Sequence, residues 1–473
     1  MTARWGKITA GEVISPVKGE LIYGEEGLPL TGVCTDSRDI PRGSIFFALK
    51  GEKFDGHDFS IKAIEKGASC IVVNKGHKID MPSGADAAVI SVQDTLRALG
   101  DLASWWRHQH DVKVAVITGS AGKTTTKEMA AHILGLTSRT LKNKGNFNNL
   151  IGLPLTVLQL EEDMDKAVLE MGMNRPGEIG RLTEIADPDV GLITNVGRAH
   201  LEGLGDITGV ARAKTELLEK ISPEGQVILN GDDGLLIKEA SRFNRDILTF
   251  GLRPENDIRA GLVKNMGKDG ISFELRYKDK TANVMIHIPG RHNLYNALAA
   301  AALALSMGEP FKNIAIGLNR YAGLKGRFKI LSLAGNVTLV DDTYNSNPSS
   351  LKAALISARD MAVDGKRVIV GLGEMMELGD ETVQAHIEAG EMVADISACH
   401  FFAMGDHAGE MIAGAIKRGL PSERAIKVAT HEEMAKKIGD AARSGDIILL
   451  KGSRRMGLES VSGRLEERWS EEV

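Results

Sequence analysis

Cysteine is scarce in this chain. Its 473 residues include three cysteines, Cys34, Cys70 and Cys399, which lie far apart and lack the spacing of metal ligands. The sequence therefore argues against a disulfide framework and against a cysteine metal site. We expect a protein that works in a reduced compartment.

Long apolar runs and a large charge imbalance are missing as well. The longest plain apolar stretch, residues 297–305, is rich in alanine and far too short to span a bilayer. Residues 1–12 lack the apolar segment of a signal peptide. The formal net charge of -5 argues against a general nucleic-acid or anionic-membrane binder. We therefore expect a cytoplasmic monomer with small-molecule partners, no nucleic-acid partner and no membrane insertion.

The length of the chain predicts about three domains, because one domain commonly has about 150 residues. Composition is that of a soluble globular protein, with 43% hydrophobic and 26% charged residues. We predict a small α/β domain over residues 1–92 and a central P-loop ATPase-like domain with a parallel sheet over residues 93–323. Residues 324–473 are predicted to form a Rossmann-like α/β domain.

Strand and helix patterns alternate along the chain. In the first domain, strand-like segments at residues 44–49 and 68–73 flank a helical stretch at residues 61–66. Helices are also predicted from residue 94 to about residue 108 and over residues 206–220. A turn rich in glycine and lysine, residues 322–327, separates the last two domains. Further predicted strands are residues 167–170, 190–194, 226–229, 337–340, 367–370, 401–403 and 446–450. The Gly-Leu-Gly turn at residues 371–373 lacks the spacing of a dinucleotide motif, so no nicotinamide site is predicted there.

The most informative segment is residues 112–126, where an apolar strand runs into a glycine-bracketed turn and then into a helix. Gly119 and Gly122 let backbone N–H groups face a phosphate, and the helix N-terminus adds its positive end. Lys123 supplies a charge for the outer phosphates, and the hydroxyl of Thr124 can hold Mg²⁺. We therefore predict a nucleoside triphosphate site formed by Gly119, Ser120, Ala121, Gly122, Lys123, Thr124 and Thr125.

This loop is a shortened variant of the general P-loop pattern. Ile117 stands where that pattern has its first glycine. The alternative is a turn that merely joins a strand to a helix. The lysine and three threonines at the helix start favour the nucleotide site.

Two residues after neighbouring strands are candidate metal ligands. Glu170 ends an apolar strand at the edge where parallel strands collect ligands, and it could coordinate Mg²⁺. His200 follows the next strand, so it also lies at the edge of the sheet where the carboxyl ends of the strands meet. The alternatives are an ordinary acidic residue at a strand end and a structural histidine.

Lys214 lies on the apolar face of the predicted helix at residues 206–220. Burial disfavours the charged form of a lysine and leaves a nucleophilic amine. Such an amine can capture CO₂ as a carbamate, an anionic metal ligand. The alternative is a lysine whose stem packs while its ammonium reaches water.

Two further segments carry polar groups suited to a nucleotide. Asn293 and Asn296 fall on one face of a helix that begins near residue 291, where their amides could read an adenine edge. Helix capping is the alternative for Asn293. Residues 341–348 follow a strand and could clamp a base and ribose, or form only a turn and helix cap.

Together these segments resemble the Mur ligase family across nearly the whole chain. The resemblance rests on Asp36-Ser37-Arg38, Asp55-Gly56-His57, residues 118–125, 146–149, 170–172 and 195–200, His292-Asn293, and residues 342–348 and 451–454. Within the family, the Asp-Thr-Tyr-Asn segment at residues 342–345 points to the member that adds D-alanyl-D-alanine. One departure is Glu374, which stands where the family has aspartate, so its role stays open.

The resemblance implies an ATP-dependent, ADP-forming ligase of peptidoglycan precursor synthesis. Its substrates would be UDP-N-acetylmuramoyl-tripeptide, D-alanyl-D-alanine and ATP. ATP would phosphorylate the carboxylate of the tripeptide, and the amine of the dipeptide would attack the acyl phosphate. The first domain would hold the UDP-linked substrate, the central domain ATP, and the last domain the dipeptide.

The resemblance also implies roles for single residues. Thr124 and Glu170 would bind one Mg²⁺, and His200 with carbamylated Lys214 the other. The implied catalytic residues are Lys123, Lys214 and His200. The further ATP-binding residues are Asn293, Asn296, Arg327, Asp342, Tyr344 and Asn345, and the substrate-binding residues are Ser37, Arg38, Asn146, Asn149 and Asn347.

Two rival functions stay open at this point. One is another amide ligase of the same superfamily, which would add a different amino acid or extend folate with glutamate. The other is a non-catalytic, nucleotide-gated binding protein. A lysine buried beside a metal site has no obvious use in such a switch, which favours the ligase.

Overall fold

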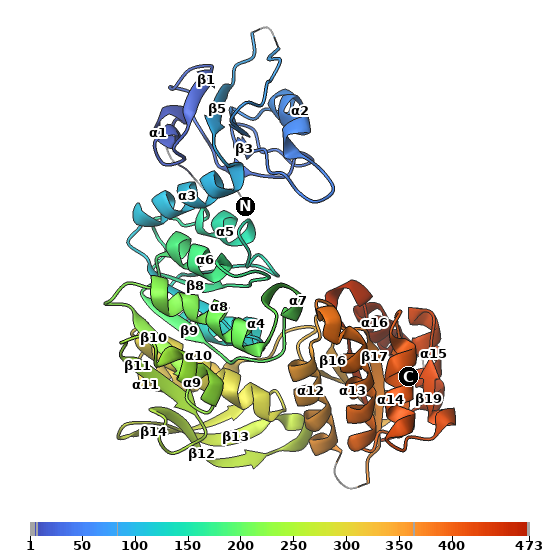
Figure 1. Ribbon diagram of the computed structural model, residues 1–473. Coiled ribbons are helices and arrows are strands. Elements are labelled where there is room, and N and C mark those ends of the chain that lie inside the picture. The colour runs from blue at the N-terminus through green and yellow to red at the C-terminus, as the bar shows by residue number, and fades with distance from the viewer. Residues whose placement is uncertain (1–4, 6–7, 83, 363–364, 471–473) are drawn as a thin grey trace.

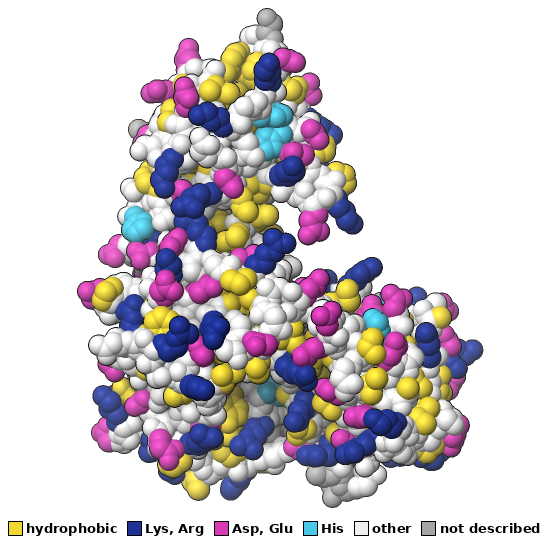
Figure 2. Space-filling model, in the orientation of Figure 1, with side chains coloured by type: hydrophobic (Ala, Val, Ile, Leu, Met, Phe, Trp, Pro, Cys, Tyr) yellow, Lys and Arg dark blue, Asp and Glu magenta, His cyan; other side chains and the backbone are white. Residues whose placement is uncertain are grey.

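The computed structural model describes residues 5, 8–82, 84–362 and 365–470, which fold into three α/β domains, each built on its own sheet (Figure 1). This confirms the predicted fold class, whereas the boundaries at residues 92 and 323 stay a prediction. The N-terminal domain lies at one end of the central domain and the C-terminal domain at its side, and the surface is hollowed between the two outer domains (Figure 2). Part of the segment predicted to lack a signal peptide, residues 1–4 and 6–7, lies outside the described residues.

The N-terminal domain has a five-stranded sheet with the order β1-β5-β4-β3-β2. Strand β1 runs antiparallel to β5, and the other neighbours are parallel. The predicted strands and helix of this domain are confirmed as β3, β4 and α2. Its elements are α1 (Ala10–Ile14), β1 (Glu20–Tyr23), β2 (Val33–Cys34), β3 (Ile45–Phe47), η1 (Gly56–Phe59), α2 (Ser60–Glu65), β4 (Cys70–Asn74) and β5 (Ala88–Val92).

The central domain has a nine-stranded sheet with the order β14-β13-β12-β11-β10-β9-β6-β8-β7. Neighbours from β12 to β7 are parallel. Its strands are β6 (Lys113–Thr118), β7 (Thr140–Lys142), β8 (Lys166–Glu170), β9 (Val190–Ile193), β10 (Gln226–Asn230), β11 (Ile247–Gly251), β12 (Ile258–Asn265), β13 (Ile271–Tyr277) and β14 (Lys280–Ile286). Its helices are α3 (Thr95–His108), α4 (Lys123–Leu134), α5 (Gly152–Val157), α6 (Glu178–Ala186), α7 (Leu201–Leu204), α8 (Ile207–Lys220), α9 (Gly234–Ala240), α10 (Arg291–Ser306) and α11 (Phe311–Arg320).

The antiparallel end of this sheet, β12 to β14, was not among the predicted elements. Much of β12 is solvent-exposed, including Leu262 and Val263, and charged residues interrupt its apolar pattern. A strand pattern needs one buried face to stand out in the sequence. Strand β12 has only a weak one, whereas in β13 the buried Ile271, Phe273 and Leu275 alternate with partly exposed residues, a signal that the sequence analysis missed.

Helix α10 explains the alanine-rich stretch at residues 297–305. Its residues from Ala297 to Ala304 are buried, and it packs on the sheet beside α4. Small side chains let the two helices and the sheet approach closely, so the apolar run is a core helix. Among the described residues, no helix is long and apolar enough to cross a membrane.

The C-terminal domain has a six-stranded sheet with the order β15-β16-β20-β17-β18-β19, parallel except for β15. This is the predicted Rossmann-like pattern. Its strands are β15 (Lys329–Ser332), β16 (Thr338–Asp342), β17 (Val368–Gly373), β18 (His400–Met404), β19 (Ala425–Lys427) and β20 (Ile447–Lys451). Its helices are α12 (Pro348–Met361), α13 (Thr382–Asp395), α14 (Ala408–Lys417), α15 (His431–Ala441) and α16 (Glu459–Ser470).

Three adjacent parallel strands position the site. Strand β6 pairs with β8 on one side and with β9 on the other. Their carboxyl ends meet at one edge, where open α/β sheets bind ligands. The phosphate loop, Glu170 and the loop that carries His200 therefore start side by side.

Candidate active site

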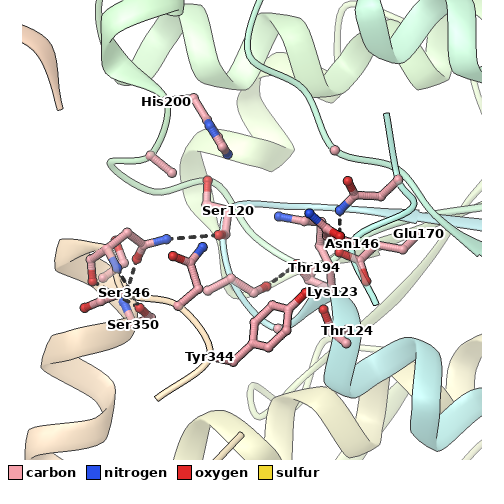
Figure 3. Close-up of a pocket in the computed structure, with 18 of the residues that line it drawn as sticks. Ser120, Lys123, Thr124, Asn146, Glu170, Thr194, His200, Tyr344, Ser346 and Ser350 are labelled. Carbon is pink, nitrogen blue, oxygen red and sulfur yellow. Dashed lines mark hydrogen bonds between the residues drawn. The ribbon is translucent and has the colours of Figure 1, made fainter. Parts of the chain in front are cut away.

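A cavity of about 890 Å³ lies where the central and C-terminal domains meet. It is lined by the phosphate loop, by the loops after β8 and β9, and by the loop between β16 and α12. Lys123, Thr124, Glu170 and His200 all contribute to it, and Figure 3 shows these side chains around a common space with Tyr344. The structure thus brings together residues predicted from three separate segments: the phosphate loop, Glu170 and His200.

The phosphate loop has the backbone that its glycines predict. Gly119 and Gly122 have φ angles of +150° and +83°, and Gly122 is the N-cap of α4. A Cβ atom on Gly119 would lie 1.9 Å from Oγ1 of Thr194. The Lys123 ammonium donates to the Gly119 carbonyl at 2.6 Å, and burial lowers the pKa of Lys123.

The end of β9 clamps this loop, a feature that the sequence analysis missed. The Asn195 side chain accepts from the Ala121 N–H at 2.9 Å and donates to the Ala121 carbonyl at 3.0 Å. The Thr194 hydroxyl donates to the same carbonyl at 2.7 Å. These contacts join residues over 70 positions apart. In the sequence, Thr194 ended a predicted strand and Asn195 opened a segment that resembles the family, but neither pattern indicated this contact.

The donor set around Glu170 and Thr124 fits Mg²⁺. Oε1 of Glu170 accepts from Asn148 at 2.9 Å, whereas the buried Oε2 has no hydrogen-bond partner among the described residues. The Thr124 hydroxyl accepts from Arg327 at 3.0 Å. No group of three His, Cys, Asp or Glu side chains that could hold a metal occurs in the described ranges. Mg²⁺ commonly takes one or two protein oxygens and fills its shell with phosphate and water.

His200 begins α7 and lines the cavity, with 23% of its side chain exposed. Its backbone is left-handed, with φ of +56°. Nδ1 lies 2.6 Å from the carboxylate of Glu377 in the C-terminal domain, a neighbour that the sequence analysis did not identify. Imidazole is a less usual ligand for Mg²⁺ than carboxylate or water.

Lys214 is fully buried in α8 and does not line the cavity. Burial lowers its pKa well below the ordinary value, and the positive charge of Lys123 lowers it further. Among the described residues, no carboxylate lies within 4.0 Å of its ammonium. Because the Lys214 side chain is buried, the alternative in which its ammonium reaches bulk water is wrong for this structure.

Asn293 and Asn296 line the cavity, and Asn296 lies against the phosphate loop. The Asn296 amide donates to Oδ1 of Asn293 at 3.1 Å, and a Cβ atom on Gly122 would lie 2.2 Å from Oδ1 of Asn296. The Asn293 amide donates to the Pro289 carbonyl at 2.8 Å. Gly290 is the N-cap of α10, so the capping alternative for Asn293 is wrong. Contact with adenine stays a prediction.

The loop after β16 carries charge and an aromatic ring into the cavity. The Lys451 ammonium donates to Asp342 at 2.6 Å and to the Asn345 carbonyl at 2.9 Å. The Tyr344 ring lies 4.1 Å from the Arg327 guanidinium carbon and 5.5 Å from that of Arg454. Two guanidinium groups therefore lie over one aromatic ring at this side of the cavity.

Asn347 caps helix α12 and also contacts the phosphate loop. Its side-chain oxygen accepts from the Ser350 N–H at 2.8 Å and caps α12. Its amide donates to the Ser120 carbonyl at 3.2 Å. The helix cap is confirmed, and the same side chain contacts the phosphate loop.

The predicted substrate-binding residues are divided between two places. Asn146 and Asn149 line the cavity, and Oδ1 of Asn149 accepts from the Gly152 N–H at 2.8 Å. Ser37 and Arg38 lie in the N-terminal domain and are not among the residues that line it. Arg38 instead pairs with Asp36 at 2.7 Å.

Glu374 does not reach the cavity. Its carboxylate accepts from the Asp406 N–H at 3.0 Å and so fixes the loop after β18. The acidic residue that does line the cavity from this segment is Glu377.

Comparisons with known proteins identify the family of this chain. Family models described as "Mur ligase family, catalytic domain", "Mur ligase middle domain" and "Mur ligase, glutamate ligase domain" match residues 29–107, 117–304 and 326–454. This chain belongs to the Mur ligase family. A UDP-N-acetylmuramoyl-tripeptide--D-alanyl-D-alanine ligase from Escherichia coli is 35% identical over 461 residues, covering 97% of this chain and 98% of the relative.

Two crystal structures of family members resemble the whole molecule. MurF from Acinetobacter baumannii superposes with a TM-score of 0.87 at 32% identity, covering 98% of this chain and 99% of that one. MurF ligase from Thermotoga maritima, solved in complex with ADP, has a TM-score of 0.81 at 28% identity, covering 93% and 98%. The family, the fold and the ATP-dependent ligase class predicted from the sequence are confirmed.

Proposed function

We propose that this Mur ligase joins D-alanyl-D-alanine to UDP-N-acetylmuramoyl-tripeptide, with conversion of ATP to ADP and phosphate, in peptidoglycan precursor synthesis. The observation that carries the proposal is the meeting of Lys123, Thr124, Glu170 and His200 in one cavity shared by two domains. Relatives that carry this activity by name match the chain over nearly its full length. We place the reaction in the cytoplasm, where ATP is available.

The reaction proceeds in two transfers. The tripeptide carboxylate attacks the γ-phosphorus of ATP, which gives an acyl phosphate and releases ADP. The dipeptide amine then attacks the acyl carbon, loses a proton, and expels phosphate as the amide forms. Backbone N–H groups of the phosphate loop and Lys123 hold the phosphates, and the shared cavity limits the access of water to the acyl phosphate.

Thr124 and Glu170 would hold Mg²⁺, which supplies positive charge for the transferring phosphoryl group. We include His200 and a carbamate on Lys214 as ligands of a second ion. The burial of Lys214, which together with the positive charge of Lys123 lowers the pKa of its amine well below the ordinary value, supports this assignment. A carbamate would also balance the positive charge of Lys123.

The test uses purified protein with ATP, Mg²⁺, UDP-N-acetylmuramoyl-tripeptide and D-alanyl-D-alanine, and reads product mass. We expect ligation product and phosphate release only when all components are present. Glutamate and single D-amino acids serve as competing amines, and a folate substrate as a competing acceptor. An ATP hydrolysis rate that does not depend on the peptide carboxylate would contradict the proposal. Faster product formation with a competing substrate would contradict it as well.

A further inference from the structure

Two loops from different domains meet at His200. His200 follows β9 of the central domain, and Glu377 follows β17 of the C-terminal domain. Oε2 of Glu377 lies 2.6 Å from Nδ1 of His200, and both residues line the cavity. The distance is short enough for a hydrogen bond, but the present orientation leaves Nδ1 without a hydrogen-bond partner among the described residues.

Both partners have a backbone that non-glycine residues rarely adopt. The φ angles of His200 and Glu377 are +56° and +62°. Such conformations are strained and persist where the surroundings hold them, often at functional sites. Here two of them face each other across a domain junction.

The Glu377 loop is firmly anchored on both sides of the glutamate. Met375 and Leu378 are each 2% exposed, whereas the Glu377 side chain is 53% exposed. His386 accepts from the Met375 N–H at 2.9 Å and contacts the Thr382 carbonyl at 2.6 Å. The carboxylate is thus presented outward from a fixed loop.

Neighbouring ion pairs hold the C-terminal domain against the His200 loop. Arg198, two residues before His200, lies 2.9 Å from Glu381 and 3.2 Å from Glu388. These pairs cross the same junction without touching His200. They therefore provide a control that separates domain contact from an effect on the imidazole.

We propose that Glu377 is a positioning residue of the ligase reaction, which holds Nδ1 of His200 and leaves Nε2 as the ring nitrogen available to the nucleotide site. Metal-binding histidines commonly donate their other ring nitrogen to a carboxylate in this way. Because the carboxylate belongs to the C-terminal domain, this part of the site is complete only when that domain lies against the central domain. The His200 contact is also the largest cause of the lowered pKa of Glu377. The inference rests on the proposed function.

The kinetic test compares Glu377→Ala with Glu381→Ala. We expect kcat of Glu377→Ala to fall about 10- to 100-fold, the range found for residues that orient metal ligands. The KM for D-alanyl-D-alanine should stay within about twofold. Glu377→Gln keeps an acceptor oxygen and should recover part of kcat. Equal losses in Glu377→Ala and Glu381→Ala would overturn the inference, because the glutamate would then act only as a domain contact.

A second variant separates positioning from folding. Glu377→Gly removes the carboxylate and relieves the left-handed backbone, so it should fold with unchanged or higher Tm and still lose kcat. The ¹⁵N shifts of the His200 ring, assigned with His200→Gln, should show Nδ1 protonated in the wild type and a mixture of tautomers in Glu377→Gly. Affinity for Mn²⁺ in the presence of ADP, measured by calorimetry, should fall about tenfold.

These readouts distinguish the two proposals. A wild-type protein that forms no ligation product contradicts the proposed function. Unchanged ring shifts together with unchanged Mn²⁺ affinity in Glu377→Gly overturn the positioning role, whatever product the wild type makes.

Discussion

The side-chain amide of Asn347 donates to the Ser120 carbonyl at 3.2 Å and joins the first turn of α12 to the phosphate loop. Arg327 makes a second link across the same junction, to the Thr124 hydroxyl at 3.0 Å. Residues of the C-terminal domain thus contact two members of the phosphate loop directly. Domain contact and nucleotide binding should therefore depend on each other.

Asn347 allows its two contacts to be separated. Asn347→Asp keeps a good N-cap for α12 but loses the amide donor to Ser120, so stability should stay nearly unchanged while the KM for ATP rises several-fold. Asn347→Ala loses the cap as well and should cost about 1 kcal/mol in the free energy of unfolding. Urea unfolding and ATP titration check the two effects. The same KM for ATP in Asn347→Asp and the wild type would contradict this role.

Lys214→Ala should abolish ligation, because the buried amine that we propose to carry the carbamate is removed. Formate or acetate should restore part of the activity by supplying a carboxylate in its place. Lys220→Ala, on the exposed end of the same helix, is the control and should retain activity. Full activity of Lys214→Ala without added carboxylate would remove the carbamate from the mechanism.

Local sequence patterns were sufficient for the parts of the site that depend on one segment. The phosphate loop could be predicted because its glycines, Lys123 and Thr124 are consecutive and their geometry follows from backbone rules. Glu170 and His200 could be predicted because parallel strands bring their carboxyl ends together. Lys214 followed from the periodicity of one amphipathic helix.

Local sequence patterns could not predict contacts between segments that are distant in the chain. Asn195 resembles any polar residue after a strand until the sheet order places it against Ala121. Glu377 was missed because its significance depends on how two domains meet. Asn293 was ambiguous because its helix starts at Gly290 and its side chain turns back to Pro289, which the residue pattern does not specify.

Gly122→Ala tests why the phosphate loop needs glycine. Gly122 and Gly177 are both N-caps with nearly equal φ angles, +83° and +87°. A Cβ atom on Gly122 would lie 2.2 Å from Asn296, whereas one on Gly177 meets nothing within 4 Å. Both variants should lose about 1–2 kcal/mol of stability from the left-handed backbone. Only Gly122→Ala should also lose ADP affinity in calorimetry. Equal ADP affinities of the two variants would show that the loop tolerates the methyl group.

His292 should make stability depend on pH. It lines the cavity with its ring edge toward Phe328, and burial lowers its pKa from 6.5 to about 4. Between these two values the unfolded chain binds a proton that the folded chain does not, so the free energy of unfolding decreases as the pH falls from 6.5 to 4. Below pH 4 both states are protonated and no further loss arises. The total is at most about 3 kcal/mol, and less because the ring keeps some exposure.

His292→Gln removes this proton and isolates its contribution from those of the other histidines. Urea unfolding at pH 4.5, 5.5, 6.5 and 7.5 should show a shallower loss of stability in the variant than in the wild type. His108→Gln is the control, because that ring is largely exposed and pairs with Asp187 at the surface. If His292→Gln loses stability with falling pH as steeply as the wild type, the buried imidazole at the cavity is not the group that titrates.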